Sequence, residues 1–157
     1  MSDYFTNIEN EFEKKIEGEI YQSLHEFLKE HQKGENWLEE LNKTNNSDDL
    51  YFLGLIYWKG IEGVEKDNKK AVEYFEKSAE KGDSNSLFFV GNLHRKGDFV
   101  KKDLNKTKNY WEKSAQGKEP ASLRAMVGLG NLYRGKKKKF IFKSISIRFM
   151  RHLSFKQ

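Results

Sequence analysis

The sequence contains no cysteine and only one proline, and each shortage has a structural consequence. Without cysteine the chain has neither a disulfide framework nor a thiolate metal site, so a reducing compartment is expected. Proline is tolerated in a helix only in the first turn. The single proline, Pro120, therefore permits long helices nearly everywhere in the chain.

Targeting signals are also missing from the sequence. No stretch approaches the roughly 18 apolar residues of a membrane span. Residues 1–5 have neither the basic flank nor the apolar segment of a secretory signal. We therefore expect a soluble, cytoplasmic protein, with export by another route left open. The 157 residues fit one domain, and the hydrophobic share of 36% is sufficient for a core.

The net charge of +5 is unevenly distributed along the chain. Residues 136–157 hold eight of the 29 lysines and arginines and none of the 24 acids, so the other 135 residues carry a net charge of −3. The body is mildly acidic, and the basicity lies in the tail. A change of reading frame near a repeat boundary could produce such a tail, as could a functional basic anchor.

Two segments of the sequence recur at a period of about 36 residues. Residues 74–79 read YFEKSA and residues 110–115 read YWEKSA, an offset of 36. Upstream, residues 53–60 (LGLIYWKG) correspond to residues 90–97 (VGNLHRKG), with one extra residue in the first loop. Residues 129–135 (LGNLYRG) repeat the first half of the unit only. Such a period is typical of solenoids built from stacked repeats.

Each unit is predicted to form a helix, a glycine-containing loop and a second helix. The first helix carries an apolar stripe at three- and four-residue spacings: Leu50, Leu53, Ile56 and Tyr57. The second helix of each copy carries an aromatic residue followed four positions later by alanine, namely Phe75 with Ala79 and Trp111 with Ala115. A small residue beside the aromatic lets a neighbouring helix approach closely.

Glycines occupy matching positions inside the three first helices, at Gly54, Gly91 and Gly130. Glycine in a helix interior costs about 1 kcal/mol relative to alanine. Something must offset this cost three times. We predict that the aromatic side chain of the following helix packs against the missing side chain.

These residues resemble the Sel-one-like repeat proteins, relatives of the tetratricopeptide repeat. The resemblance covers residues 48 to about 135. In the first copy the matching residues are Leu53, Gly54, Tyr57, Gly60, Gly63, Val64, Asp67, Lys70, Ala71, Phe75 (for tryptophan), Lys77, Ala79 and Gly82. In the second copy they are Gly91, Gly97, Val100, Asp103, Trp111, Lys113, Ala115 and Gly117, with His94 for tyrosine, Phe99 for glycine and Thr107 for alanine.

The resemblance implies an all-α, right-handed solenoid of antiparallel helix pairs whose first helices line a concave surface. It also implies an adaptor or scaffold in bacterial signalling, secretion or host interaction. The expected organisation is an N-terminal helical cap or degenerate repeat (1–47), repeat 1 (48–84), repeat 2 (85–120), the first helix of a partial third repeat (121–135) and a basic tail (136–157). Within the cap, one helix is predicted over residues 7–33, opened by Thr6 with Glu9 in a capping-box pattern.

The secondary structure of the tail stays open. Phe142, Ile145, Phe149 and Leu153 could form a helical stripe, whereas Ile145, Ile147 and Phe149 also alternate with polar residues as in a strand. The tail either makes a poor second helix on the helix at 121–134 or is loose.

No catalytic or metal-binding pattern stands out. The four histidines, His25, His31, His94 and His152, show no i, i+4 pairing, and His94 occupies the packing position of the family's tyrosine. Nucleophile-elbow and phosphate-loop motifs are missing. We expect a protein that is not an enzyme and has no metal site, no cofactor and no small-molecule substrate.

The best candidate site is the concave face, where another protein or a peptide would bind. Asn92 and Asn131 each follow a repeat glycine, and Arg95 and Arg134 follow three positions later. Asparagine can hydrogen-bond a peptide backbone, and arginine can bind a carboxylate through two donors. Further anchors are expected at Trp58 and Phe88.

Two other interpretations stand beside this one. The asparagines and arginines could simply face water. Alternatively, the four consecutive lysines 136–139 and the apolar residues after them could bind anionic lipid or nucleic acid, which would make the protein a peripheral anchor.

Overall fold

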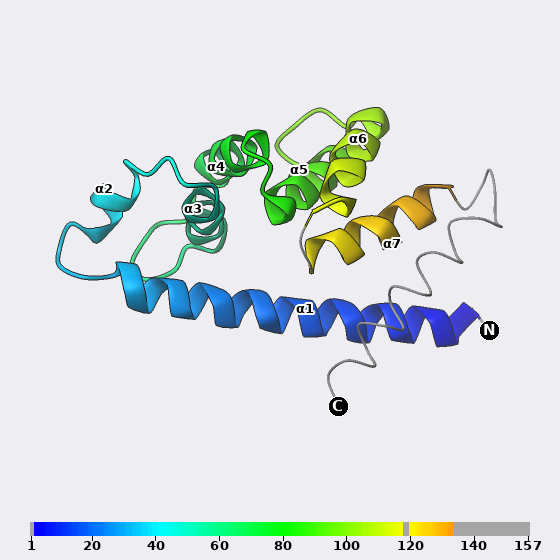
Figure 1. Ribbon diagram of the computed structural model, residues 1–157, viewed down its shortest axis with the longest axis horizontal. Coiled ribbons are helices and arrows are strands. Elements are labelled where there is room, and N and C mark those ends of the chain that lie inside the picture. Colours follow the sequence, from blue (N-terminus) through cyan, green and yellow to red (C-terminus); the bar gives the residue numbers. More distant parts are fainter. Residues whose placement is uncertain (1, 118–119, 134–157) are drawn as a thin grey trace. The chain divides into compact units, whose positions relative to one another are not determined.

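The computed structural model describes residues 2–117 and 120–133, in which helices joined by loops are present and no strand is found (Figure 1). The all-α class expected from the sequence is confirmed. The helices are α1 (Ser2–His31), α2 (Trp37–Leu41), α3 (Ser47–Lys59), α4 (Asn68–Glu80), α5 (Ser84–Lys96), α6 (Leu104–Ala115) and α7 (Ala121–Tyr133). The chain divides between residues 45 and 46 into two compact units, each described by itself below.

The N-terminal unit contains the long helix α1 and the one-turn helix α2. The expected start of α1 at Thr6 is wrong, because the helix begins at Ser2. No proline or glycine interrupts residues 3–6, so nothing stops the helix from including them. The helix ends at His31, where the imidazole stacks on Phe27 with ring centroids 4.1 Å apart. Gly34 follows in a left-handed conformation, with φ +87°.

In the second unit, helices α3 to α6 all begin at a side chain that accepts hydrogen bonds from the first helical turn. Asp67 accepts from the backbone N–H groups of Lys69 and Lys70, and Asp103 accepts in the same way from Asn105 and Lys106, all at 2.9–3.1 Å. Asn46 and Asp83 cap α3 and α5. These caps satisfy backbone donors that a helix start leaves unpaired, which explains why the helices begin where they do.

The loops of the two full repeats close in the same way. Helices α3 and α5 are followed by the capping residues Gly60 and Gly97, whose φ angles of +68° and +82° favour glycine. The backbone N–H of Asp67 donates to the carbonyl of Tyr57, and that of Asp103 donates to the carbonyl of His94, both at 2.9 Å. The cap of each second helix is thereby tied to the last turn of the first.

Helices α3 to α7 of the second unit are arranged in two rows (Figure 1). The first row consists of α3, α5 and α7, and the second row consists of α4 and α6. Each helix from α3 to α7 packs against the next one in the chain, and α5 also contacts α7. The first helices of successive units therefore share one face, which is the arrangement of a helix-pair solenoid.

Aromatic rings of the second helices lie directly on the glycines of the first helices. A Cβ atom at Gly54 would stand 2.6 Å from Cε1 of Phe75, and one at Gly91 would stand 2.5 Å from Cδ1 of Trp111. Real Cβ atoms do not approach so closely, so both contacts require glycine. The indole Nε1–H of Trp111 also donates to the carbonyl of Phe88 at 3.2 Å.

Each of these aromatic rings also meets the first helix of the next unit. Phe75 stacks on Phe89 of α5, with ring centroids 4.1 Å apart. Trp111 instead faces Gly128 of α7, where an added Cβ would lie 2.5 Å from Cζ3 of the indole. Phe89 and Gly128 both stand two residues before a repeat glycine. The larger aromatic therefore pairs with the smallest residue, and the smaller aromatic with phenylalanine.

Buried serines join the last turn of each second helix to the first residue of the first helix in the same repeat. The hydroxyl of Ser78 donates to the carbonyl of Ser47 at 2.7 Å, and that of Ser114 donates to the carbonyl of Ser84 at 2.8 Å. Ser78 also accepts a hydrogen bond from Ser86 of the next repeat, at 2.8 Å. These bonds hold the end of each second helix against the start of its own first helix.

The third aromatic residue, which is expected to pack against Gly130, lies outside the described residues, as do residues 136–157. Gly130 itself, on α7, is half-buried. Within the described ranges, no helix is long and apolar enough to cross a lipid bilayer.

We expect the Gly91→Ala substitution to lower the free energy of unfolding by about 1–3 kcal/mol, because the new methyl group collides with the hydrogen-bonded indole of Trp111. Gly18→Ala is the matched control, since nothing lies within 4 Å of a Cβ at this helical position. It should stabilise the protein by up to about 1 kcal/mol. Urea unfolding followed by circular dichroism measures both. Equal effects at the two sites would contradict the packing argument.

A double-mutant cycle tests the pairing of Trp111 with Gly128. In the wild type, Gly128→Ala should be destabilising because the methyl group meets the six-membered ring of the indole. In the Trp111→Phe background that ring edge is gone, so the same substitution should cost less, with a coupling of about 0.5–3 kcal/mol. Additive effects in chemical unfolding would show that the two residues do not compete for one space.

Candidate protein-interaction site

The candidate site lies on the row of first helices. We call it the first-helix face and define it by Trp58, Asn92, Arg95 and Asn131. Trp58 and Arg95 stand four residues after a repeat glycine, and Asn92 and Asn131 stand one residue after it. Trp58 and Asn92 are half-buried, and Arg95 and Asn131 are exposed. Arg134, the expected partner of Asn131, lies outside the described residues.

Asn92 and Arg95 form a pair on α5. Nε of Arg95 donates to Oδ1 of Asn92 at 3.3 Å, so the two side chains orient each other. The guanidinium carbon of Arg95 lies 6.0 Å from the ring centroid of Trp111, at the outer limit of a cation–π contact. The amide nitrogen of Asn92 and the Nη groups of Arg95 take no part in this bond. The pair can therefore donate hydrogen bonds to a peptide carbonyl or a carboxylate.

Phe88 belongs to the core rather than to the surface, because only 6% of it is exposed. Its ring stacks on Trp111 at 5.8 Å, and the guanidinium carbon of Arg124 lies 4.4 Å from its ring centroid. This burial argues against the expected role of Phe88 as a binding anchor, since a partner could reach little of it. The position is equivalent to that of Tyr51 in α3, which is also buried.

Trp58 lies at the centre of an aromatic cluster. Its ring meets Phe89 edge-on at 5.0 Å and Phe99 edge-on at 5.7 Å. Phe99 is 59% exposed and has a φ angle of +60°, at the position where the first repeat has Gly63 with φ +78°. A left-handed conformation costs a non-glycine residue about 1–2 kcal/mol. The loop thus keeps the backbone of its glycine counterpart while presenting an aromatic ring.

His94 performs the packing role of the family's tyrosine. Its ring stacks on Tyr110 at 5.8 Å, as Tyr57 stacks on Tyr74 at 5.6 Å in the first repeat. Nδ1 lies 3.1 Å from the carbonyl oxygen of Lys101, and since a carbonyl can only accept, Nδ1 carries the proton. Among the described residues no three histidine, aspartate or glutamate side chains group as metal ligands.

The sequence analysis missed Arg124, Gly128 and Phe99. Arg124, Gly128 and Asn131 have i, i+4, i+7 spacing on α7, the same spacing as Phe88, Asn92 and Arg95 on α5. Such a spacing places each set on one side of its helix. A comparison of these two sets of residues would have indicated that Arg124 lies on the same side of α7 as Asn131. Phe99 departs from the family's glycine, and a non-glycine residue at such a position is itself a signal.

Two aspartates that cap helices differ in their electrostatic surroundings. Burial raises the pKa of the Asp83 carboxyl group, although the hydrogen bond from the backbone N–H of Ser86 partly opposes this. Hydrogen bonds from the backbone N–H of Lys106 and Asn105 lower the pKa of Asp103, which is half-buried. Burial, and to a smaller extent the nearby carboxylate of Asp83, raise the pKa of the Tyr51 hydroxyl group.

The paired helices, their repeated glycine contacts and the shared first-helix face define a helix-pair repeat protein of the α-solenoid class. Residues 47–83 and 84–118 each match the model of the Sel1 repeat. The chain is therefore a Sel1-like repeat protein over these residues, as its sequence motifs indicated.

Solved structures support this assignment. The chain is similar to a Sel1 repeat protein from Oxalobacter formigenes, with 25% identity and a TM-score of 0.58, over 71% of this chain and 47% of that one. It is also similar to c5321, described as a protective antigen present in uropathogenic Escherichia coli strains and displaying an SLR fold, with 29% identity and a TM-score of 0.53. That match covers 72% of this chain and 24% of the other.

A curated relative is the ERAD-associated E3 ubiquitin-protein ligase component HRD3B of Arabidopsis thaliana. It is 33% identical over 97 residues, which are 61% of this chain and 14% of that protein. The chain thus corresponds to a small part of this relative.

The two caps should respond to pH with opposite sign. Asp83 has a folded-state pKa above the ordinary value of about 3.9, so its contribution to stability is lost as pH rises through that raised pKa. Asp83→Asn keeps a capping side chain and removes this loss, so the variant should gain stability relative to the wild type as pH rises from about 4 to neutral.

Asp103→Asn is the matched control. The pKa of Asp103 is lowered in the fold, so its contribution to stability is present above about pH 4 and is lost as pH falls through the lowered pKa. This variant should lose stability relative to the wild type as pH rises from about 2 to about 4, the range in which the contribution of Asp103 develops, and should change little from there to neutral pH. Tm measured at several pH values decides between these signs, and parallel curves for the two variants would contradict the assignment.

Proposed function

We propose that this chain is a non-catalytic adaptor or scaffold that binds a peptide or protein surface along its first-helix face. The observation that carries the proposal is the oriented Asn92–Arg95 pair, with Asn131 at the equivalent position of α7. Side chains at equivalent positions of stacked repeats are spaced regularly, which suits an extended backbone. In solenoids of this kind the row of first helices lines a concave surface.

The relatives support the general class of function. Sel1 repeats are a non-catalytic repeat scaffold, and the proteins that contain them are generally protein-interaction modules. HRD3B is by its name a component of a ubiquitin-protein ligase. By analogy, the partner of this chain would be another protein, and no cofactor or small-molecule substrate would be needed. We further propose that it acts in the cytoplasm.

Capture of a partner from native lysate tests the proposed face. The double variant Asn92→Ala/Asn131→Ala should weaken capture about tenfold, because it removes amide donors and acceptors at both repeat positions. Asn105→Ala/Asn109→Ala on α6 is the matched control, since both asparagines are exposed and lie on the row of second helices. Its capture should be unchanged. Equal loss in the two double variants, or none in either, would exclude the first-helix face as the binding site.

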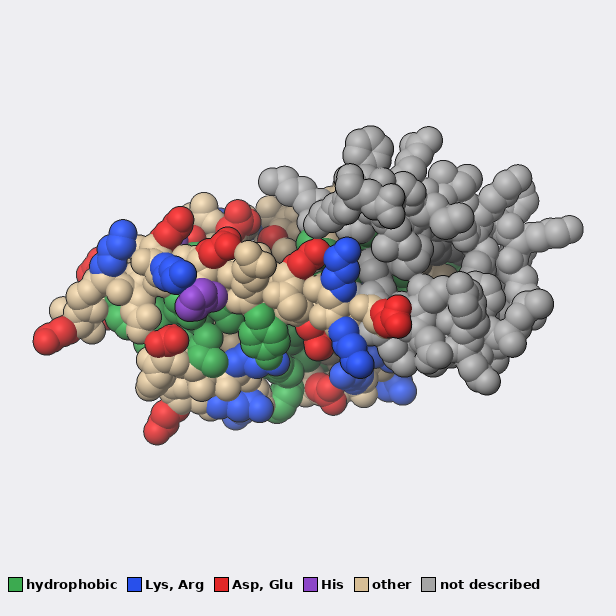
Figure 2. All heavy atoms as spheres, turned by 90° about the horizontal axis from the view of Figure 1, so that it is seen from below, with side chains coloured by type: hydrophobic (Ala, Val, Ile, Leu, Met, Phe, Trp, Pro, Cys, Tyr) green, Lys and Arg blue, Asp and Glu red, His purple; other side chains and the backbone are tan. Residues whose placement is uncertain are grey.

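A second candidate function rests on the basic tail, with eight bases and no acid in residues 136–157. Such a segment could bind anionic lipid or nucleic acid. On the face shown in Figure 2, by contrast, acidic and basic side chains of the described residues are interspersed. Any strong attraction to a polyanion would therefore depend on the tail.

Replacing the four lysines 136–139 by glutamine in the full chain separates the two candidates. If the first-helix face is the functional site, partner capture should persist in this variant. If the tail is the functional site, binding to phosphatidylserine vesicles or to a single-stranded DNA oligonucleotide should be present in the wild type and fall severalfold. Loss of partner capture with unchanged helicity would contradict the face and favour the tail.

A further inference from the structure

Two of the three first helices of the second unit, α5 and α7, carry only basic residues among their charged side chains, whereas α3 carries Asp48 and Asp49. Helices α5 and α7 contain no aspartate or glutamate, and their charged residues are Arg95, Lys96 and Arg124. The second helices α4 and α6 hold four glutamates, Glu73, Glu76, Glu80 and Glu112, besides their lysines. The part of the first-helix face formed by α5 and α7 is thus cationic, whereas the 135 residues before the tail have a net charge of −3.

Arg95 of this face and the neighbouring Arg124 of α7 both stand near aromatic rings. The guanidinium of Arg124 lies over Phe88, Phe88 stacks on Trp111, and Arg95 lies over the same indole. Arg95 is further oriented by its bond to Asn92. An arginine that is already oriented loses less conformational entropy when it binds a carboxylate than a freely rotating one does. The arrangement therefore suits an acidic group.

The neighbouring part of the face is apolar. Trp58 of α3 occupies the repeat position that Arg95 occupies in α5. The exposed ring of Phe99 stands 5.7 Å from it, in a backbone conformation that glycine adopts in the first repeat. Strained residues concentrate at functional sites because some other advantage must maintain them. A large apolar side chain of a partner would cover both rings.

We infer that the partner is a protein segment that carries both an acidic residue and a large apolar residue. The carboxylate binds Arg95 and the amide nitrogen of Asn92, and the apolar side chain packs on Trp58 and Phe99. This inference rests on the proposed function and specifies its ligand. A nucleic acid fits less well, because the cations are few, one side of the site is apolar and the body repels a polyanion.

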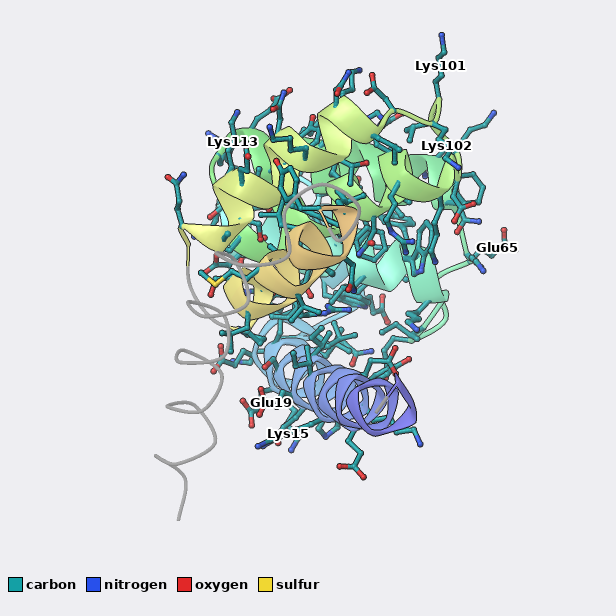
Figure 3. The ribbon with its side chains drawn as sticks, turned by 90° about the vertical axis from the view of Figure 1, so that its right-hand side faces the viewer. Lys15, Glu19, Glu65, Lys101, Lys102 and Lys113 are labelled. Carbon is teal, nitrogen blue, oxygen red and sulfur yellow. The ribbon has the colours of Figure 1, made fainter. Side chains whose placement is uncertain are left out.

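Three lysines, two in the loop between α5 and α6 and one on α6, are the natural control residues. Lys101 and Lys102 extend from this loop away from the ribbon, and Lys113 lies on α6, as Figure 3 shows. All three are exposed, and they are not part of the first-helix face. A purely non-specific attraction to acidic peptides would depend on them as much as on Arg95.

A library of random 12-residue peptides displayed on phage, selected on the immobilised full chain, tests the inference. The selected peptides should be enriched in aspartate or glutamate together with aromatic or aliphatic residues, relative to the unselected library. A selected peptide, made synthetically and labelled, should bind the wild type and lose about tenfold in affinity to Arg95→Gln by fluorescence anisotropy. Lys113→Gln should bind it as the wild type does.

The same peptide with its acids replaced by their amides completes a double-mutant cycle. It should bind the wild type about tenfold more weakly, yet show little difference between the wild type and Arg95→Gln.

The Phe99→Gly variant tests the apolar part of the site. It should bind the acidic peptide severalfold more weakly without losing thermal stability, because the substitution removes the exposed ring and also relieves the strained backbone. A fall in Tm instead would show that Phe99 is a packing residue.

The possible failures are distinguishable. Selected peptides without acid enrichment, whose binding is still reduced by Asn92→Ala/Asn131→Ala, would overturn the ligand chemistry and leave the proposed face in place. Selected peptides that bind equally well to that double variant would overturn both. Tighter binding of a single-stranded DNA oligonucleotide than of any selected peptide, lost in Arg95→Gln, would assign the face to nucleic acid.

Discussion

The insertion of an aromatic ring between glycines is the contact on which the second unit depends. Trp111 reaches into the space left by Gly91 on one side and by Gly128 on the other, and its indole nitrogen bonds the carbonyl of Phe88. Three helices meet at this one side chain. Because protein interiors are densely packed and deform little, the ring determines how closely α5 and α7 approach and which of their side chains become neighbours. The first-helix face is a consequence of that approach.

The repeats keep their backbone while their side chains vary. His94 replaces Tyr57 and still stacks on a tyrosine of the second helix, and Phe99 replaces Gly63 and still adopts a positive φ angle. Such constancy follows from the caps and loop hydrogen bonds, which are made by the backbone and by short polar side chains. Positions outside this framework are free to differ between repeats. The interaction chemistry of a solenoid resides in these differences rather than in the conserved framework.

The change from Trp58 in α3 to Arg95 in α5 illustrates this freedom. Both residues occupy one repeat position and lie against aromatic rings of the core, yet one offers an apolar surface and the other a cation. Two adjacent repeats therefore provide two kinds of contact at nearly regular spacing. A small solenoid can in this way recognise a mixed ligand with few residues, since most of the binding energy of an interface comes from a few anchors.

The sequence by itself determined the helix pairs, their caps, the loop glycines and the repeat period of residues 47–118, because these features depend on local hydrogen bonds and on spacing along the chain. It placed the start of α1 five residues too late, at residue 7 instead of Ser2, since neither proline nor glycine stops that helix before Thr6. Only the tertiary structure decided that Phe88 is buried, that Arg124 covers it and that Gly128 receives Trp111. These contacts join residues far apart in the chain, and their outcome depends on how closely three helices can pack.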